Sequence, residues 1–171
     1  RIRRTMMVRR MTIKKIRKKK SLKKIKNRRK ERIQWLYQET TMSYNAPVKD
    51  MMFVLKELAG LDQVSQLPGC EDATEETVDA VLNENAKFTS EVVAPLNWSG
   101  DVEAANWKDG VVTTAKGFKE AFKAFGEQGW QGLQHPAEFG GQGLPKLVAT
   151  PCMEMVNGAN LSFALCPLLT D

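Results

Sequence analysis

The side chains that could carry out chemistry are few in this sequence and widely spaced. Cys70, Cys152 and Cys166 form no CxxC pair, and the one histidine, His135, is followed by a proline in a predicted loop. This spacing argues against a zinc site or a disulfide framework and favours reduced thiols. The carboxylates fall mainly on predicted helix faces, where they are solvated. From the residues alone, we therefore expect no metal site and identify no catalytic residue.

A glycine-rich loop, Phe139–Gly143, precedes Leu144-Pro145 and the start of a predicted helix. Backbone N–H groups at such a place can cradle a phosphate. The dinucleotide fingerprint G-x-G-x-x-G, however, has a different glycine spacing and follows a strand, and this loop has neither feature. A tight turn that needs the backbone freedom of glycine is the preferred interpretation.

The elements that would position these residues are predicted to be mainly helices. A first helix is expected over Val48–Ala59 with a stop at Gly60, followed by a connector, Leu61–Cys70, that turns at Pro68-Gly69. The apolar stripe of this helix consists of Met51, Met52, Val54, Leu55 and Leu58.

A second helix is predicted to begin at Asp72 or Thr74 as its N-cap and to end or kink at Pro95. Acidic residues in its first turn favour this start. The polar stretch Asn97–Asn106 after it is expected to be a loop. The residues expected on the buried side of the helix are Val78, Val81, Leu82, Phe88, Val92 and Val93.

Asp109-Gly110 between apolar β-formers predicts a short hairpin over Trp107–Val112. The next helix should stop near Gly126–Gly129 and turn an aromatic stripe toward the core. That stripe consists of Phe118, Phe122 and Phe125.

A last helix is predicted with Thr150 as its N-cap and Pro151 at its first position, and Pro167 should break it. Its middle, residues 157–160, is small and polar. That composition would allow another helix or a ligand to approach closely.

Charge divides the chain into two compositions. Residues 1–41 hold 18 of the 26 Lys and Arg residues and two acids, a net charge of +16, whereas residues 42–171 hold eight Lys, no Arg and 18 acids, a net charge of −10. We therefore expect two parts, a basic extension over 1–41 that is non-globular or helical and a helical domain over 42–171. The like charges in the extension repel one another along any helix that they form.

The basic extension has three interpretations. It could be an arm that binds nucleic acid through phosphate contacts, or a mitochondrial presequence, although Ser21 is its one serine. The third interpretation, which we favour, is the translation of sequence upstream of a start at Met42. Nucleic acid is therefore not the expected partner. No run of about 18 apolar residues and no secretory signal occurs. We expect no membrane span and a cytoplasmic location.

Several segments of residues 42–171, in this order, resemble those of acyl-CoA dehydrogenases. The resemblance covers essentially all of 42–171 and none of 1–41. The opening helix is similar to the longer subgroup that includes methylthiopropionyl-CoA dehydrogenases. The matching segments are Tyr44-x-Ala-Pro-x-x-Asp50-Met-x-Phe-Val-Leu-x-Glu57, Leu67-Pro-Gly69, Ala94-Pro-Leu-Asn97, Gly110-Val-Val-Thr-Thr114, Gly117-Phe-Lys-Glu-Ala-Phe122, Gly129-Trp130, Phe139-Gly-Gly-Gln-Gly-Leu-Pro145, Glu154-Met and Ala159-Asn-Leu-Ser-Phe-Ala-Leu165.

The resemblance implies the all-α N-terminal domain of an oxidoreductase, with one short β-hairpin, incomplete at its C-terminal end. Enzymes of this family bind FAD, desaturate an acyl-CoA thioester between Cα and Cβ, and usually pass electrons to an electron-transfer flavoprotein. It also implies a homo-oligomer when the enzyme is complete. The base, a glutamate, and most flavin contacts are expected beyond Asp171, so the fragment alone should be inactive.

What this part can offer is one wall of the acyl pocket, and the candidate residues are Asn160, Phe163 and Ala164. Plain helix packing is the competing interpretation of these three residues. Two other functions remain open: a small nucleic-acid-binding protein with a basic tail, and a helical interaction module with an exposed apolar surface at Leu161–Leu169.

Overall fold

The computed structural model describes residues 23–29 and 44–169 of the chain, which fall into two units, 1–42 and 43–171. In the first unit residues 23–29 form a helix with exposed side chains, five of them basic. The rest of the predicted basic extension lies outside the described residues. Among the described residues, no helix is both long and apolar enough to cross a bilayer.

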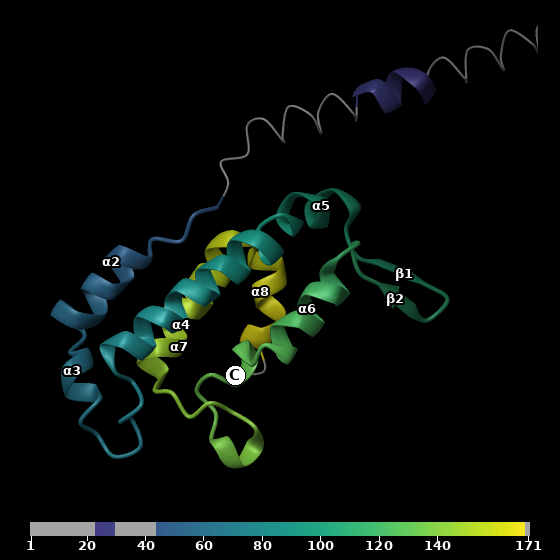
Figure 1. The fold of residues 1–171 in the computed structure, drawn as a ribbon. Coiled ribbons are helices and arrows are strands. Elements are labelled where there is room, and N and C mark those ends of the chain that lie inside the picture. Colours follow the sequence, from purple (N-terminus) through teal and green to yellow (C-terminus); the bar gives the residue numbers. More distant parts are fainter. Residues whose placement is uncertain (1–22, 30–43, 170–171) are drawn as a thin grey trace, which may run out of the picture. The chain divides into compact units, whose positions relative to one another are not determined.

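The described part of the second unit is helical except for one two-stranded antiparallel hairpin, as the sequence predicts (Figure 1). Its elements in order are α2 Val48–Phe53, the π-helix η1 Val54–Leu58, α3 Leu61–Val64, α4 Glu75–Phe88, the π-helix η2 Thr89–Val93, α5 Leu96–Glu103, β1 Asn106–Lys108, β2 Val111–Thr113, α6 Phe118–Glu127, the 3-10 helices η3 Trp130–Gly132 and η4 Ala137–Phe139, α7 Lys146–Ala159 and α8 Leu161–Leu168.

The first predicted helix is present as α2 and η1, but its apolar stripe is only partly buried. Met51 and Leu55 lie in the core, whereas Val54 and Leu58 are exposed. A π-helix adds a residue to the turn, shown by the bond from the Ala59 N–H to the Val54 carbonyl. The extra residue turns Leu58 away from the face that Met51 and Leu55 share.

Glycine ends this helix as predicted, but the connector is not wholly irregular. Gly60 has a φ of +70° and directly precedes α3, a single short helix within the predicted connector Leu61–Cys70. Leu61 is buried in the core, which explains why tertiary packing holds this turn as helix. The predicted turn at Pro68-Gly69 is present, with Gly69 at a φ of +83°.

Thr74 is the N-cap of α4, since its hydroxyl oxygen accepts a hydrogen bond from the Thr77 N–H at 3.2 Å. Of the predicted buried side, Val78, Leu82, Phe88 and Val93 are buried and Val81 and Val92 are half-buried. Asn85 and Thr89, both unpredicted, are buried on the same side, and the Thr89 hydroxyl donates to the Asn85 Oδ1 at 3.4 Å.

The predicted loop Asn97–Asn106 is wrong, because most of it is the helix α5. Pro95 lies just before α5 with a helical φ of −61°. Proline is tolerated at a helix start, where its missing N–H would have no partner in the helix. Leu96 packs against the apolar cluster around Phe163, so tertiary contact outweighs the polar composition of this stretch.

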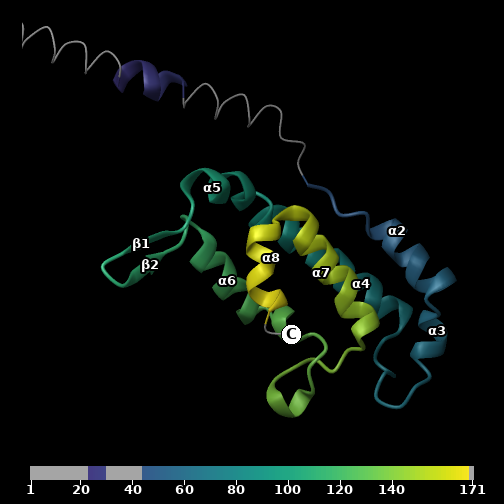
Figure 2. The ribbon, with the colours of Figure 1, turned by 180° about the vertical axis from the view of Figure 1, so that it is seen from behind.

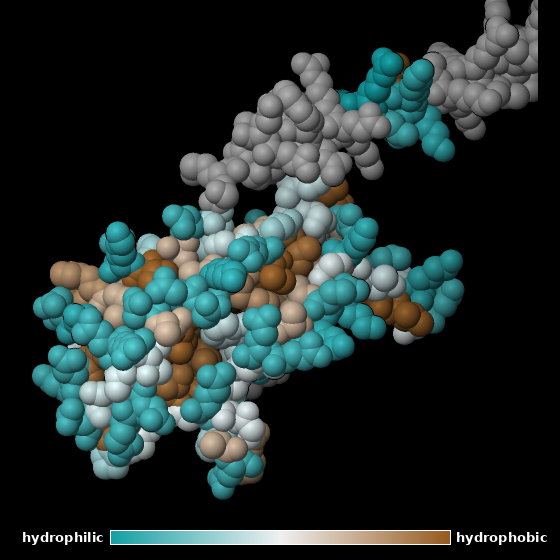
Figure 3. Space-filling model, in the orientation of Figure 1, coloured by the Kyte–Doolittle hydropathy of each residue, from teal (hydrophilic) through white to brown (hydrophobic). Residues whose placement is uncertain are grey.

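The Asp-Gly turn produces the predicted hairpin. Trp107 pairs with Val112, and both Asp109 and Gly110 have positive φ, 51° and 81°. Two consecutive positive φ values match the right-handed twist of a tight hairpin. The hairpin projects from the helices in both views (Figures 1 and 2) and carries an apolar patch on its surface (Figure 3).

The predicted helix start at Thr150-Pro151 is wrong. Helix α7 begins five residues earlier, at Lys146 rather than Pro151, and contains Pro151. The ring removes one helical hydrogen bond, but Pro151 is buried in the packed face and the Thr150 hydroxyl bonds to the Lys146 carbonyl at 2.8 Å. The helix also does not continue to Pro167, because it ends at Ala159 and α8 begins after Asn160.

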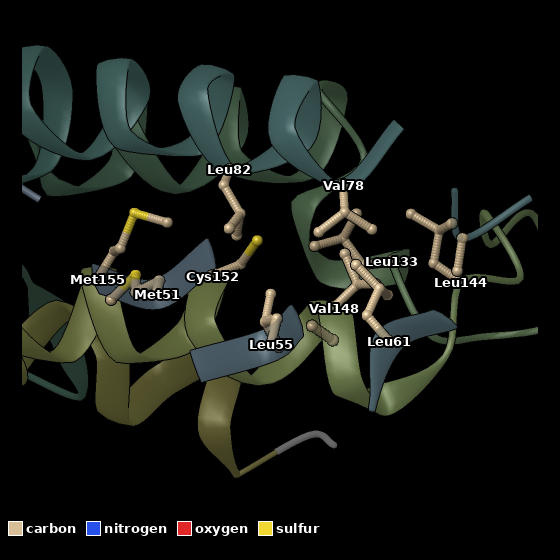
Figure 4. Packing of buried hydrophobic residues seen from close by; sticks show 12 residues of the cluster. Met51, Leu55, Leu61, Val78, Leu82, Leu133, Leu144, Val148, Cys152 and Met155 are labelled. Atoms are coloured by element: carbon tan, nitrogen blue, oxygen red, sulfur yellow. The ribbon is translucent and has the colours of Figure 1, made fainter. Parts of the chain in front are cut away.

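Helices α4 and α7 lie side by side and enclose a first core with α2 and α3. In Figure 4, Leu82 of α4 points toward Cys152 of α7, and Leu55 lies on the opposite side of the cluster. A second core joins α4, η2, α6, α7 and α8 around Phe88, Phe125 and Phe163. This second core holds α8 against α6.

Candidate functional site

A hollow of about 690 Å³ lies between α5, the hairpin, α6 and α8. Pockets for small molecules span roughly 300–1,000 Å³, so its size suits an organic ligand. We call it the α6–α8 hollow; α8 lies between α6 and α7 in Figure 2. Its lining consists of Gly100, Ala105, Val112, Thr113, Thr114, Ala115, Phe118, Lys119, Phe122, Ser162, Phe163 and Cys166.

The α6 wall begins at Gly117, which has a φ of +90°. A side chain there would meet Leu96 at 2.7 Å from its Cβ, so both the backbone angle and the close contact require glycine. The three aromatic side chains of α6 differ in how deeply they are buried. Phe125 is buried, Phe118 is half-buried and Phe122 is 42% exposed, so the prediction that all three lie in the core is wrong for Phe122.

Phe163 of α8 lies at the centre of this aromatic group. Its ring centroid is 6.2 Å from Phe118, 6.2 Å from Phe122 and 5.9 Å from Phe125, with interplanar angles between 54° and 77°. Tilted and edge-on pairs at such distances are favourable for aromatic rings. The four rings hold α6 and α8 together, and three of them, Phe118, Phe122 and Phe163, form an apolar wall of the hollow.

Gly100 of α5 lets the same aromatic group reach a third helix. A Cβ at Gly100 would lie 2.6 Å from the Phe118 ring. Phe118 therefore lies directly against the α5 backbone. The Glu103 carboxylate accepts a hydrogen bond from the Lys116 N–H at 3.2 Å and ties the end of α5 to the loop before α6.

Strand β2 and the residues after it close the side of the hollow opposite α8. Ala115 is buried, whereas Val112 is 66% exposed and Trp107, its partner across the hairpin, is 70% exposed. Neither side chain belongs to the two cores. This wall therefore depends on a hairpin that few core contacts support.

The chemistry that the lining offers is apolar contact with a few polar groups. Lys119 is the one charged residue in the lining, and Thr113, Thr114 and Ser162 supply hydroxyls. No carboxylate or histidine is part of the lining. It can enclose an apolar chain, with one cation available for a negative group. Across the described residues, no three His, Cys, Asp or Glu side chains gather as a metal site.

The three predicted pocket residues have different positions, and their role stays a prediction. Phe163 lines the hollow. Ala164 is fully buried in the second core, and Asn160 is 1% exposed at the junction of α7 and α8. The sequence does not predict the lining residues of α5 and β2 as pocket residues; it indicates Val112 only as part of a hairpin and Thr113 and Thr114 only through the family resemblance.

The glycine-rich loop is a tight turn, as the preferred interpretation has it. Gly140 and Gly143 have φ values of +85° and +69°, and a Cβ at Gly141 would lie 2.0 Å from the His135 carbonyl oxygen. The N–H groups of residues 140–144 all donate to carbonyls of the same loop region. With these groups already engaged, the loop is no phosphate cradle, and Phe139 beside it is 80% exposed.

Comparison with known proteins decides the family. The model of the "Acyl-CoA dehydrogenase, N-terminal domain" family matches residues 75–171, which include α4 to α8 and the whole lining of the hollow. The chain belongs to the acyl-CoA dehydrogenase family. The resemblance inferred from the sequence is thereby confirmed.

A relative of this acyl-CoA dehydrogenase domain is 3-methylmercaptopropionyl-CoA dehydrogenase from Ruegeria pomeroyi. The two are 44% identical over 130 residues, which cover 76% of this chain and 22% of the relative. The chain thus spans about a fifth of the length of that enzyme. The similarity agrees with the subgroup that the opening helix indicates.

Proposed function

We propose that this chain forms the N-terminal wall of the acyl pocket in an FAD-dependent enzyme that desaturates an acyl-CoA thioester between Cα and Cβ. Membership of the acyl-CoA dehydrogenase family supports the enzyme class. The observation that carries the role is the apolar α6–α8 hollow, of ligand size, within the family domain. Phe163 is the proposed contact for the acyl chain.

Within this proposal the described residues bind the acyl chain and shield it from water. The groups that carry out the reaction are not among these residues. Desaturation needs a base that takes the proton from Cα and an acceptor that takes the hydride from Cβ. The flavin, when bound, supplies the hydride acceptor. The hollow lining contains no carboxylate, and the glycine-rich loop has no free N–H group for a pyrophosphate. The residues described here therefore do not fit FAD by themselves. We propose that the glutamate base and the flavin contacts come from sequence beyond Asp171.

The remaining parts of the proposal rest on the family. We propose a homo-oligomer that passes electrons to an electron-transfer flavoprotein, in the cytoplasm. The three free cysteines, Cys70, Cys152 and Cys166, support a reducing compartment. The relative's name suggests a short acyl group with a thioether as one substrate to compare with simple acyl groups.

The test is binding of acyl-CoA by the full chain. Calorimetry with acetyl-, butanoyl- and hexanoyl-CoA should show affinity that rises about threefold to fourfold per methylene, since burying one CH₂ contributes about 0.8 kcal/mol. Coenzyme A alone should bind more weakly than any of the three. The purified chain should retain no FAD.

A pair of variants locates the site. Cys166→Trp places an indole in the hollow and should abolish the dependence on acyl length. Leu165→Trp is the control, because Leu165 is the adjacent α8 residue, exposed and outside the lining. Equal binding of all chain lengths by the unaltered protein, or a flavin-loaded yellow preparation, would contradict the proposal.

A further inference from the structure

Asn160 is a buried polar residue at the point where α7 ends and α8 begins. It is 1% exposed and its backbone is extended, with φ −160° and ψ 90°. A buried amide side chain lowers stability unless its polar atoms are hydrogen-bonded. The partners that Asn160 uses come from two different helical segments.

On the side of α8, the Asn160 Oδ1 accepts two hydrogen bonds. The Phe163 N–H donates to it at 3.1 Å and the Ser162 hydroxyl donates to it at 2.7 Å. The first is an N-cap bond, which satisfies one of the N–H groups that a helix leaves open at its start. Both donors belong to residues that line the α6–α8 hollow.

On the other side, the Asn160 Nδ2 donates to the Val93 carbonyl at 3.3 Å, across 67 residues of sequence. Val93 is the last residue of the π-helix η2 and is fully buried. A π-turn inside a helix changes which carbonyls have helical partners, and such turns are frequent where a structure serves a function. Here the buried end of η2 meets the first turn of α8 through one side chain.

We infer that Asn160 is a positioning residue: by bonding both η2 and α8, it sets the direction in which α8 presents Ser162, Phe163 and Cys166 to the hollow. This rests on the proposed function, since the hollow is the acyl site proposed above. The residue type follows from the two bonds. Aspartate and serine can cap a helix, but aspartate cannot donate to Val93 and serine is too short to span the same gap.

Cys166 provides a direct measurement, because its thiol is free and exposed in the hollow lining. The full chain carrying Cys70→Ser serves as the background, which leaves Cys152 and Cys166. Cys152 is 2% exposed and does not compete for a thiol reagent. The rate at which a neutral disulfide reagent modifies Cys166, with and without butanoyl-CoA, reports the position of α8 and access to the hollow.

Three variants separate positioning from stability. Asn160→Ser keeps a cap and loses the bond to Val93, whereas Asn160→Ala loses both. Asn85→Ala is the control, since Asn85 is equally buried, accepts its hydrogen bond from Thr89 four residues further along the chain rather than from α8, and is not part of the hollow lining. Melting curves of all three variants measure how much stability is lost when a buried amide is removed. Effects on Cys166 can then be compared with that loss.

Asn160→Ser and Asn160→Ala should both change the Cys166 rate by about fivefold, the effect of a small change in local free energy, and both should lose protection by butanoyl-CoA. Asn85→Ala should keep the Cys166 modification rate of the background protein and its protection by butanoyl-CoA. This should hold even if Asn85→Ala lowers the melting temperature as much as the Asn160 variants do. A serine variant that behaves like the background would overturn the inference, because capping alone would then suffice. The Asn160 variants could instead change the Cys166 rate while butanoyl-CoA fails to protect Cys166 in the background protein. That result would count against the proposed function and leave the positioning role standing.

Discussion

Burial changes the chemical reactivity of single side chains in this domain. Cys152 shows this clearly, because it lies in the first core between α4 and α7 and points toward Leu82 (Figure 4). Burial raises the pKa of the Cys152 thiol from 9.0 to about 12. Desolvation disfavours the thiolate, which is the reactive form of cysteine.

We predict that Cys152 does not react with thiol reagents in the folded protein at pH 8, while Cys70 and Cys166 do. A thiol count should give two groups in buffer and three in denaturant. The same shift makes the folded state favour the protonated thiol. Its contribution to the free energy of unfolding is therefore present below about pH 9 and is lost as pH rises toward 12. Three reactive thiols in the folded protein would contradict the buried position.

Stability at high pH should not be assigned to Cys152 alone. The pKa of Tyr44 is also raised, first by burial and then by the negative charge of Glu154. Its contribution to stability is likewise lost as pH rises above its ordinary value of 10.0. The thiol count is the sharper measurement, since tyrosine does not contribute to it.

Among the elements, the hairpin β1–β2 is the one whose weak attachment bears on the hollow. An isolated two-stranded hairpin is at best marginally stable in water. This hairpin keeps its shape through the tight turn at Asp109-Gly110 and contributes Val112 and Thr113 to the hollow lining. Its state should therefore affect ligand binding more than global stability.

Gly110→Val tests the element directly, because a β-branched residue is strained at the φ of +81° found there. The strain, of order 1–3 kcal/mol, should unfold the hairpin locally and weaken hexanoyl-CoA binding by about tenfold. The melting temperature of the helical body should change little. Calorimetry and a melting curve check the two effects.

Gly69→Val is the matched control. Gly69 has a similar φ of +83°, nothing lies within 4 Å of its Cβ position, and it is outside the hollow lining. It should leave hexanoyl-CoA binding unchanged. If both variants weakened binding equally, general strain would explain the result and the hairpin would have no special part in the hollow.

At the scale of the whole molecule, the two charge compositions correspond to two units. Both buried clusters are built from residues between Tyr44 and Ala164, all within the second unit. We predict that a chain beginning at Met42 melts at the same temperature as the full chain and binds hexanoyl-CoA with the same affinity. Differential scanning calorimetry and isothermal calorimetry measure the two quantities.

The same deletion separates the alternative role of the basic extension. If residues 1–41 form an arm for nucleic acid, the full chain binds DNA with an affinity that falls steeply with salt, and the shortened chain does not. If the extension has no such role, the two chains behave alike at 0.15 M salt. A loss of folding on deletion would show instead that the second unit depends on the first.

Much of the local structure is predictable because it depends on residues close in sequence. The N-cap at Thr74, the hairpin at Asp109-Gly110 and the stop at Gly60 follow from backbone preferences of single residue types. The family follows from the order of many short segments, which no single motif carries. The loop predicted at α5 from its polar composition is wrong because contacts with residues far away in the sequence outweigh local preference there.

The sequence by itself determined the helical class, the hairpin, the two charge compositions and the family. Only the tertiary structure decided which residues of each stripe are buried, where α7 gives way to α8, and which walls meet at the hollow. These features depend on contacts such as Asn160 with Val93 and Phe163 with Phe118, which join residues far apart in the chain. A hydrophobic period predicts that a helix has an apolar face, but the phase of that face and its partner are set by packing.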